Sequence, residues 1–374
     1  MFYRKLVCSF LVTASLPWIA YGAPQGSDGV LSKRTPSSAP APQLVPGEIS
    51  QKGQLPAAYN AGAAYQCRGG YDLFFTGDYI YWDWTQASMK AGDIVVSSSS
   101  SGHQKAFVLS PGYASGFQVG FGSTTLSADD WQIRGNYTWY QNSVSSNTSI
   151  SSGTYYRYIE TFSDRLNFFS GDVSLNQKMN YNELELLLER PFYFGKRLLS
   201  NIGVGLASLW VVQHNHTNLN GTYGVTLSNV TTQLQSQTDK HFKVWCLGPR
   251  VELDTSWLLG EGVAFLANAT SSLVYARYYN LSANGQITTP TGTNSLSQSF
   301  PNNFNTLRPI LQMFLGMGWN QGFNDNSWRV GLSAGYDFAM YWNFDMLSFT
   351  STQGNLVAGN MFLHGLNAQI RFDF

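Results

Sequence analysis

The stretch that decides the fold is LHGLNAQIRFDF, residues 363–374, at the end of the chain. From Gly365 onward, small, polar or charged residues alternate without exception with apolar ones. Alternation with period two over about ten residues indicates a strand with one polar and one apolar face. That length suits a tilted strand crossing a bilayer, and a stripe ending on Phe374 is typical of the closing strand of a membrane barrel.

Composition agrees with a membrane barrel. Charged residues make up 12% of the chain, about half the usual share of about 25%, while aromatics reach 15%. The longest apolar stretch lies at the start, where Arg4 and Lys5 precede an apolar run over 6–19 and a small-x-small site at 20–22. This pattern predicts a cleaved signal peptide over residues 1–22, and hence an exported protein.

The mature chain is expected to be nearly neutral. Removing Arg4 and Lys5 from the 22 basic residues leaves 20, against 22 acidic ones, which argues against nucleic acid as a partner. Cys67 and Cys246 are too few for a disulfide framework, and the sequence leaves their state open. Residues 23–66, rich in Pro, Ser and Ala, predict a flexible periplasmic segment before a barrel over 67–374.

Beyond residue 70 the chain reads as a series of strands. Alternation is clearest over 131–139, 183–189 and 328–340, whereas 71–84 is apolar on both faces and its register stays open. The predicted strands lie near 71–84, 112–122, 129–140, 178–190, 198–212, 241–255, 262–279, 307–320, 328–345 and 361–374.

The connections are predicted to differ on the two sides of the sheet. Four are short turns, and five are long and rich in Ser, Thr, Asn and Gly, at 85–111, 141–177, 213–240, 280–306 and 346–360. Short periplasmic turns and long extracellular loops are typical of an antiparallel up-and-down transmembrane barrel, here of about 10 strands. Twelve strands are possible if 153–162 and 164–176 pair with each other. A soluble β-sandwich also alternates, but it needs no such sided loops.

Four blocks carry a resemblance to a known family. They are FTGDYIYW (75–82), SPGYASGFQVGFG (110–122), LGPRVELDTSW (247–257) and GYDF (335–338). In this order, over roughly 71–374, they resemble the Legionella-type major outer-membrane-protein-like family of pore-forming β-barrels, which also occurs in chlamydia-like bacteria. The resemblance implies an outer-membrane protein that forms or resembles a pore, and it offers no catalytic residue to carry over.

Charged residues opposite the apolar stripes are expected to face a polar lumen, because an Arg or Lys facing lipid at mid-bilayer costs about 2–4 kcal/mol. The set comprises Arg134, Glu183, Glu185, Glu189, Lys243, Arg250, Glu252, Asp254, Arg308, Arg329, Asp337, Arg371 and Asp373. Six basic against seven acidic residues predict little preference for the sign of an ion. The set could line an open pore or plug a narrow barrel with salt bridges, and both stay open.

Aromatic residues near strand ends are predicted to form interface girdles, with a carbohydrate-stacking platform as the alternative. They are Trp82, Trp84, Trp139, Tyr140, Trp210, Trp257, Trp319, Trp328, Tyr341 and Trp342. Glycines at every second position, such as Gly203 and Gly205, should leave room in the lumen or let the strand bend.

No catalytic or cofactor site is predicted. His214 and His216 could offer imidazoles to a metal but lack a clear third ligand, and the five histidines show no spacing typical of a nucleophilic triad. The sequence thus predicts no enzyme, no metal and no cofactor.

The function expected from these patterns is a porin in the bacterial outer membrane, allowing passive diffusion of ions and small hydrophilic solutes. The alternative is a surface adhesin or structural barrel with a plugged lumen. Expected partners are outer-membrane lipid and other copies of the chain. The family resemblance further implies a barrel-assembly machinery that reads Ile370, Phe372 and Phe374 as its signal.

Overall fold

The computed structural model describes residues 67, 72–96, 103–124, 131–150, 154–158, 167–224, 231–299, 303–350 and 355–374. The predicted signal peptide over 1–22 lies outside the described residues, as does the predicted segment over 23–66. No described helix has the length and apolar character needed to cross a membrane. The one short helix in this part of the chain is η1 (Ala87–Met89), and nearly all the rest is strand.

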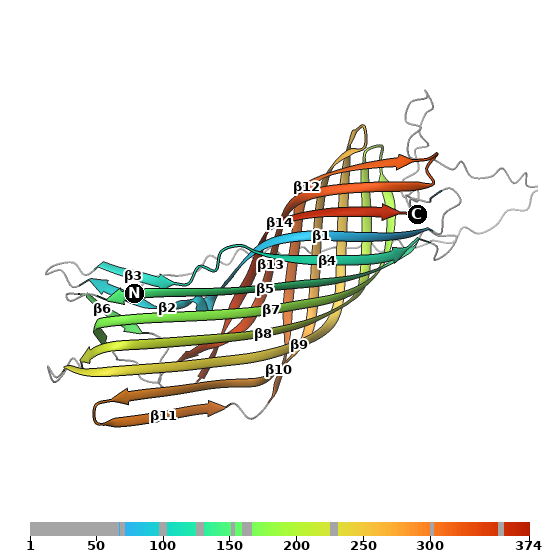
Figure 1. The fold of residues 1–374 in the computed structure, drawn as a ribbon. Helices are drawn as coiled ribbons and strands as arrows, with labels where there is room; N and C mark the ends of the chain where they lie inside the picture. Colours follow the sequence, from blue (N-terminus) through green and yellow to red (C-terminus); the bar gives the residue numbers. More distant parts are fainter. Residues whose placement is uncertain are drawn as a thin grey trace, which may run out of the picture. The chain divides into compact units, whose positions relative to one another are not determined.

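Ten of the described strands form a closed antiparallel ring (Figure 1). In order around the ring they are β1 (Leu73–Gln86), β4 (Ala114–Ser123), β5 (Gln132–Ile150), β7 (Asn167–Phe194), β8 (Leu198–Gly224), β9 (Thr231–Gly260), β10 (Val263–Thr289), β12 (Phe304–Phe323), β13 (Trp328–Thr350) and β14 (Asn355–Asp373). β14 pairs with β1, so the ring leaves no open edge between its first and last strands. The ten strands predicted from the sequence are confirmed.

The last strand closes the barrel in the predicted orientation. Its pairing with β1 runs from Asp373 opposite Phe74 to Met361 opposite Gln86. Beyond the ladder, the Phe374 N–H donates to the Leu73 carbonyl at 2.9 Å, and the Leu73 N–H donates back at 3.0 Å. The predicted assembly residues lie exposed on the outer face, namely Ile370, Phe372 and Phe374.

Replacing Phe374 with Asp, or deleting it, should abolish most barrel assembly while export continues. An unclosed barrel exposes backbone donors and acceptors that lipid cannot satisfy, so the chain should aggregate or be degraded. Heat-modifiable gel migration of membrane extracts measures the folded fraction. Phe323→Asp is the matched control, because Phe323 is another exposed aromatic residue and it is the last residue of β12. Equal assembly of both variants at wild-type yield would contradict a signal in the last strand.

The segments predicted as long loops are largely strand. β7, β8, β9 and β10 run for 27–30 residues, well beyond the 9–11 that cross a membrane. In their polar outer parts, apolar residues such as Val173, Leu175 and Leu219 still recur at alternate positions and are buried. This weak alternation, together with β-branched Thr residues that favour strands, is consistent with the extension of the hairpins beyond the membrane-crossing part.

Four short strands lie outside the ring, on the same side as these long hairpins. β6 (Thr154–Tyr158) pairs with the beginning of β7 and with β2 (Lys90–Val96), which pairs with β3 (His103–Val108). β11 (Gly292–Ser299) pairs only with β10. The twelve-strand alternative is therefore wrong, because β6 does pair with β7 but does not join the barrel wall.

Alternation assigns the two faces of the wall as predicted. On β7, Leu184, Leu186 and Leu188 are exposed outward, whereas Glu183, Glu185 and Glu189 are buried on the inner face. The ring has a short-turn end, where tight turns at 195–197, 261–262 and 324–327 join the strands. Gly195 (φ 67°) and Gly262 (φ 80°) supply left-handed backbone there, which favours glycine. The opposite end, where the hairpins extend, is called the long-hairpin end.

Toward the long-hairpin end, large apolar side chains fill the inside of the barrel. This apolar layer includes Trp84, Tyr140, Tyr181, Phe242, Tyr278, Tyr341 and Phe344, all almost fully buried. The predicted interface girdle is therefore wrong for four residues. Trp84, Tyr140 and Tyr341 point into the barrel, as does Trp82 on the same face of β1. Trp210, Trp257, Trp319 and Trp328 are exposed outside, as predicted.

An irregular stretch of β13 contributes to the apolar layer. Its pairing with β14 shifts register between Tyr341 and Asp345 and again before Ser348, and Asn343 has a φ of 53°. Phe344, Asp345, Met346 and Leu347 are all buried as a result, and they are called the inward segment. The Ser88 N–H of η1 donates to the Asp345 carboxylate at 2.7 Å, which joins this segment to the end of β1. Together these residues close the interior of the barrel.

Candidate functional site

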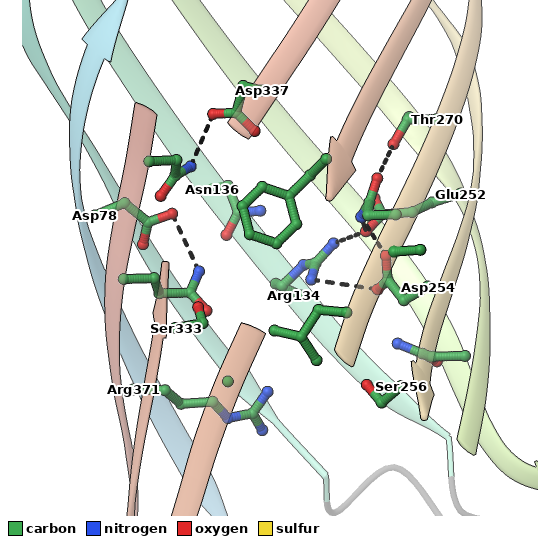
Figure 2. Close-up of a pocket in the computed structure, with 18 of the residues that line it drawn as sticks. Asp78, Arg134, Asn136, Glu252, Asp254, Ser256, Thr270, Ser333, Asp337 and Arg371 are labelled. Carbon is green, nitrogen blue, oxygen red and sulfur yellow. Dashed lines mark hydrogen bonds and ion pairs between the residues drawn. The ribbon is translucent and has the colours of Figure 1, made fainter. Parts of the chain in front are cut away.

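Between the apolar layer and the short-turn end lies a polar cavity of about 400 Å³. Side chains from the inner faces of all ten ring strands line it, because alternate residues on each strand point inward. Figure 2 shows Asp78 and Asp337 toward one wall and Arg134, Glu252 and Asp254 toward the other. Most of the charged residues predicted to face the lumen gather here.

Arg134 of β5 is the centre of the first charged cluster. Its guanidinium lies 2.8 Å from Glu189 of β7 and 2.5 Å from Glu252 of β9, with Asp254 at 4.0 Å. Glu189 also accepts hydrogen bonds from Gln132 (2.9 Å) and Asn201 (2.8 Å). Since a buried charge is tolerated only when it is paired and hydrogen-bonded, the cluster holds four neighbouring strands in one arrangement.

Arg250 of β9 forms a second cluster closer to the apolar layer. It lies 2.9 Å from Glu183 and 2.7 Å from Glu185, and it also donates to Gln312 of β12. The Glu183 carboxylate accepts a hydrogen bond from the Tyr181 hydroxyl at 2.5 Å, and that hydroxyl lies 2.8 Å from the hydroxyl of Tyr341. The charged cavity and the apolar layer therefore meet at these tyrosines.

The opposite wall carries two carboxylates, which accept hydrogen bonds from side-chain amides and from an indole. Asp78 of β1 accepts a hydrogen bond from Gln369 at 3.1 Å. Asp337 of β13 accepts from Asn367 at 3.0 Å and from the Trp82 indole at 3.1 Å. Among the described residues, neither carboxylate forms an ion pair with an arginine.

Other predicted lumenal residues lie outside the groups described so far. Arg329 and Arg371 line the cavity near the short-turn end, and Arg371 pairs with Asp373 at 2.7 Å. Arg308 lies above the ring of Tyr278, 5.7 Å from its centroid, at the level of the apolar layer. Lys243 was predicted inside, but it shares the outer face of β9 with Trp245 and Leu247, and that prediction is wrong.

The charge balance also differs from the prediction. Acidic residues lining the cavity are Asp78, Glu183, Glu185, Glu189, Glu252, Asp254 and Asp337, while the basic ones are Arg134, Arg250, Arg329 and Arg371. Seven carboxylates against four guanidinium groups give the cavity a formal excess of negative charge. The expectation of near-balance failed because Lys243 and Arg308 do not line the cavity. Asp373, which was also predicted, does not line it either, and Asp78 takes its place among the seven acidic residues.

The sequence missed Asp78 and the amides that complete both clusters. Asp78 lies on a strand that is apolar on both faces, so alternation gave it no side. Gly203 on the inner face of β8 fits the prediction that small residues leave room inside. A Cβ added there would meet Glu189 Cγ at 3.1 Å and Glu252 Cβ at 3.5 Å, so glycine leaves space for the Arg134 cluster.

One group of side chains in the cavity offers metal-ligand atoms. Carboxylate oxygens of Glu189, Glu252 and Asp254 lie within 4.8 Å of one another. The Arg134 guanidinium lies among them and supplies the positive charge that a cation would otherwise bring. The proximity of these three carboxylates is therefore explained by their ion pairing with Arg134. Cys246, inside the apolar layer, and Cys67, before β1, are both free thiols.

Comparison with solved structures gives outer-membrane proteins of very low identity. The Escherichia coli outer membrane protease OmpT is 8% identical, with a TM-score of 0.39, over 81% of this chain and 96% of that one. The Pseudomonas putida toluene transporter TodX is 9% identical, with a TM-score of 0.21, over 84% and 95%. Likenesses at this level carry no functional argument. No curated protein matches the chain.

The family assignment rests on sequence. The profile of a family described as Legionella pneumophila major outer membrane protein precursor matches residues 58–374, which includes every strand of the barrel. This match confirms the resemblance carried by the four sequence blocks. It also places the barrel in the bacterial outer membrane, with its short-turn end periplasmic and its long hairpins extracellular. The chain belongs to the Legionella pneumophila major outer membrane protein family.

Proposed function

We propose that this protein is a pore through which ions and small hydrophilic solutes diffuse passively. The observation that carries the proposal is the charged cavity itself. In its extracellular half the barrel fills its interior with apolar side chains, whereas in its periplasmic half it keeps about 400 Å³ of space lined by charged and amide groups together with apolar residues such as Leu266 and Phe314. A barrel of ten strands is narrow enough for side chains to fill, so a polar space of this size needs a reason beyond stability.

In this conformation the apolar layer separates the cavity from the extracellular side. Passage therefore requires the inward segment (Phe344–Leu347) to move. Its two register shifts interrupt the ladder between β13 and β14, so it should open at a lower free energy than a regularly paired strand. The proposed pore is thus gated, with the closed state held by buried side chains and by the Asp345–Ser88 hydrogen bond.

The pore should prefer cations, because seven carboxylates face four guanidinium groups in the cavity. Reversal potentials across a planar bilayer in a salt gradient measure this preference. Replacing Asp78 and Asp337 with Asn removes the two carboxylates that have no ion-pair partner among the described residues, and it should shift the reversal potential toward zero. Asp239→Asn, at an exposed position, is the control and should leave the potential unchanged. An anion-selective wild type would contradict this prediction.

The rival function is a structural or adhesive barrel, and the apolar layer is the observation that favours it. Planar-bilayer recording separates the two, because inserted protein that never conducts supports the rival. Shortening the β8–β9 hairpin beyond the Gly221–Leu234 pair should then abolish surface binding, whereas a pore should keep its conductance.

A non-catalytic role is part of the proposal. The histidines whose side chains the structure describes lie on outward-facing positions of their strands, away from the cavity; they are His214, His216, His241 and His364. The cavity carboxylates are engaged by arginine or by amide and indole donors, which suits an ion-lined passage.

A further inference from the structure

A row of basic side chains lies on the outer face of the barrel, just beyond its apolar belt. Lys178 of β7 lies directly opposite His214 of β8, and His214 lies opposite His241 of β9. Lys243 follows two residues after His241, and Arg277 of β10 lies opposite Trp245. These five residues, on four adjacent strands, are called the basic patch. Figure 1 shows the four strands side by side.

The depth of the basic patch in the membrane is fixed by the residues below it. On β8 the outward residues from Leu198 to Val212 are mostly apolar, and His214 is the first ionisable one. Trp210 and Trp245 lie opposite each other at the upper limit of this belt. Tryptophans of this kind lie at the boundary between acyl chains and headgroups. The basic patch therefore lies at the level of the lipid headgroups, on the extracellular side.

The charges of the basic patch are not balanced within the described part of the protein. Lys178, Lys243 and Arg277 form no ion pair there, and the nearby Asp239 carboxylate is bound to His216 at 2.5 Å. Burial, with the ammonium groups of Lys243 and Lys178, lowers the pKa of His214. Burial, His214 and Lys243 likewise lower the pKa of His241. The positive charge over these strands is therefore that of Lys178, Lys243 and Arg277, and a bound anion would balance it.

The geometry suits a phosphate group. The exposed imidazole of His214 packs against that of His241, with 4.1 Å between ring centroids and 30° between ring planes, and its ring N–H is available to donate. Lys178 and Arg277 are exposed on either side, so long cationic side chains flank the imidazole pair. Around the rest of the ring, the outward positions at this level include Gln141 of β5, next to β7, and Asp83 of β1, and the described residues form no cluster of bases there.

We propose that the basic patch binds the phosphate groups of an anionic lipid in the outer leaflet of the outer membrane. Cationic side chains at headgroup level attract anionic lipid with about 1 kcal/mol each. Trp210 and Trp245 beneath the basic patch would contact the acyl chains of the same lipid. One lipid molecule would then be bound both at its phosphate groups and at its acyl chains. Such a site anchors the barrel at a fixed height and orientation.

The test is a lipid titration of the full-length protein in detergent, followed by native mass spectrometry. The probes are lipid A with two phosphates, the same lipid without phosphate, and inorganic phosphate as competitor. Lys178→Gln with Lys243→Gln should weaken binding of the phosphorylated lipid about thirtyfold, as expected for about 1 kcal/mol per lysine. Arg277→Gln alone should weaken it about fivefold.

The matched control removes two positive charges at the other end of the barrel. Lys196→Gln with Arg197→Gln changes exposed residues in the β7–β8 turn and should leave lipid binding within about twofold of wild type. Heat-modifiable migration confirms that each variant is folded. The proposal is overturned if both double variants lose binding equally, or if neither loses it. Equal binding of the lipid without phosphate also overturns it, as does full displacement by millimolar inorganic phosphate.

Discussion

Replacing Trp84 and Phe344 with alanine should open the barrel to ions. Both side chains are fully buried in the apolar layer, and removing one large core aromatic residue typically costs about 3–5 kcal/mol. If the open state does not bury these rings, that cost falls on the closed state alone. A loss of about 3 kcal/mol then raises the ratio of open to closed molecules about a hundredfold. Planar-bilayer recordings should show long openings where the wild type opens rarely.

The control for this prediction lies on the other face of the same wall. Leu206→Ala with Trp210→Ala shortens two exposed side chains of β8 that face the membrane. This variant should keep the wild-type opening frequency, because it leaves the interior unchanged. If the Trp84 and Phe344 variant inserts, shows heat-modifiable migration and never conducts, the apolar layer is a structural core and not a gate.

Replacing Arg250 with Met should destabilise the barrel by about 3–5 kcal/mol, the usual cost of removing one partner of a buried ion pair. Glu183 and Glu185 would lose their cation, at 2.9 Å and 2.7 Å, while remaining buried. The midpoint of urea unfolding in lipid vesicles measures the loss of stability. Lys196→Met, in an exposed turn, should leave the midpoint unchanged.

A second substitution distinguishes an electrostatic effect from a packing effect. Glu185→Gln in the Arg250→Met background removes one of the two uncompensated carboxylates. It should recover part of the lost stability, although the same change in the wild type should destabilise the barrel. If Glu185→Gln lowers stability equally in both backgrounds, Arg250 contributes through its packing, and the ion pair with Glu185 is not the source of the effect.

The sequence predicted the wall of the barrel better than its interior. Alternation such as that of Leu184, Leu186 and Leu188 reports a face that meets lipid, and lipid imposes the same requirement on all ten strands. The inside of the barrel imposes no single requirement. It is polar near Arg134 and apolar near Trp84. Strands in the extracellular half are therefore apolar on both faces, and the sequence does not show which of their residues point inward.

That ambiguity explains the particular errors. Lys243 follows the buried Phe242 and precedes Val244, Trp245 and Cys246, so the sequence around it gives no contrast between faces. Trp84 and Tyr341 look like interface residues because an aromatic residue at a strand end can serve a girdle or an internal layer equally well. The two ion-pair clusters could not be found from spacing, because Arg134 of β5 and Glu252 of β9 lie on strands separated by two others and are 118 residues apart in the sequence.

Thiol modification of a conducting barrel tests the central claim most directly, namely that ions pass through the charged cavity. Ser333 and Ala334 are neighbours on β13, and Ser333 lines the cavity while Ala334 faces outward. Each is replaced with Cys in the open Trp84→Ala, Phe344→Ala background, and a positively charged thiol reagent is added during recording. We expect an irreversible, stepwise fall in current with Cys at 333. We expect no change with Cys at 334, or in the Trp84→Ala, Phe344→Ala variant that has no introduced cysteine. An unchanged current with Cys at 333, despite complete labelling, would show that ions do not pass through this cavity.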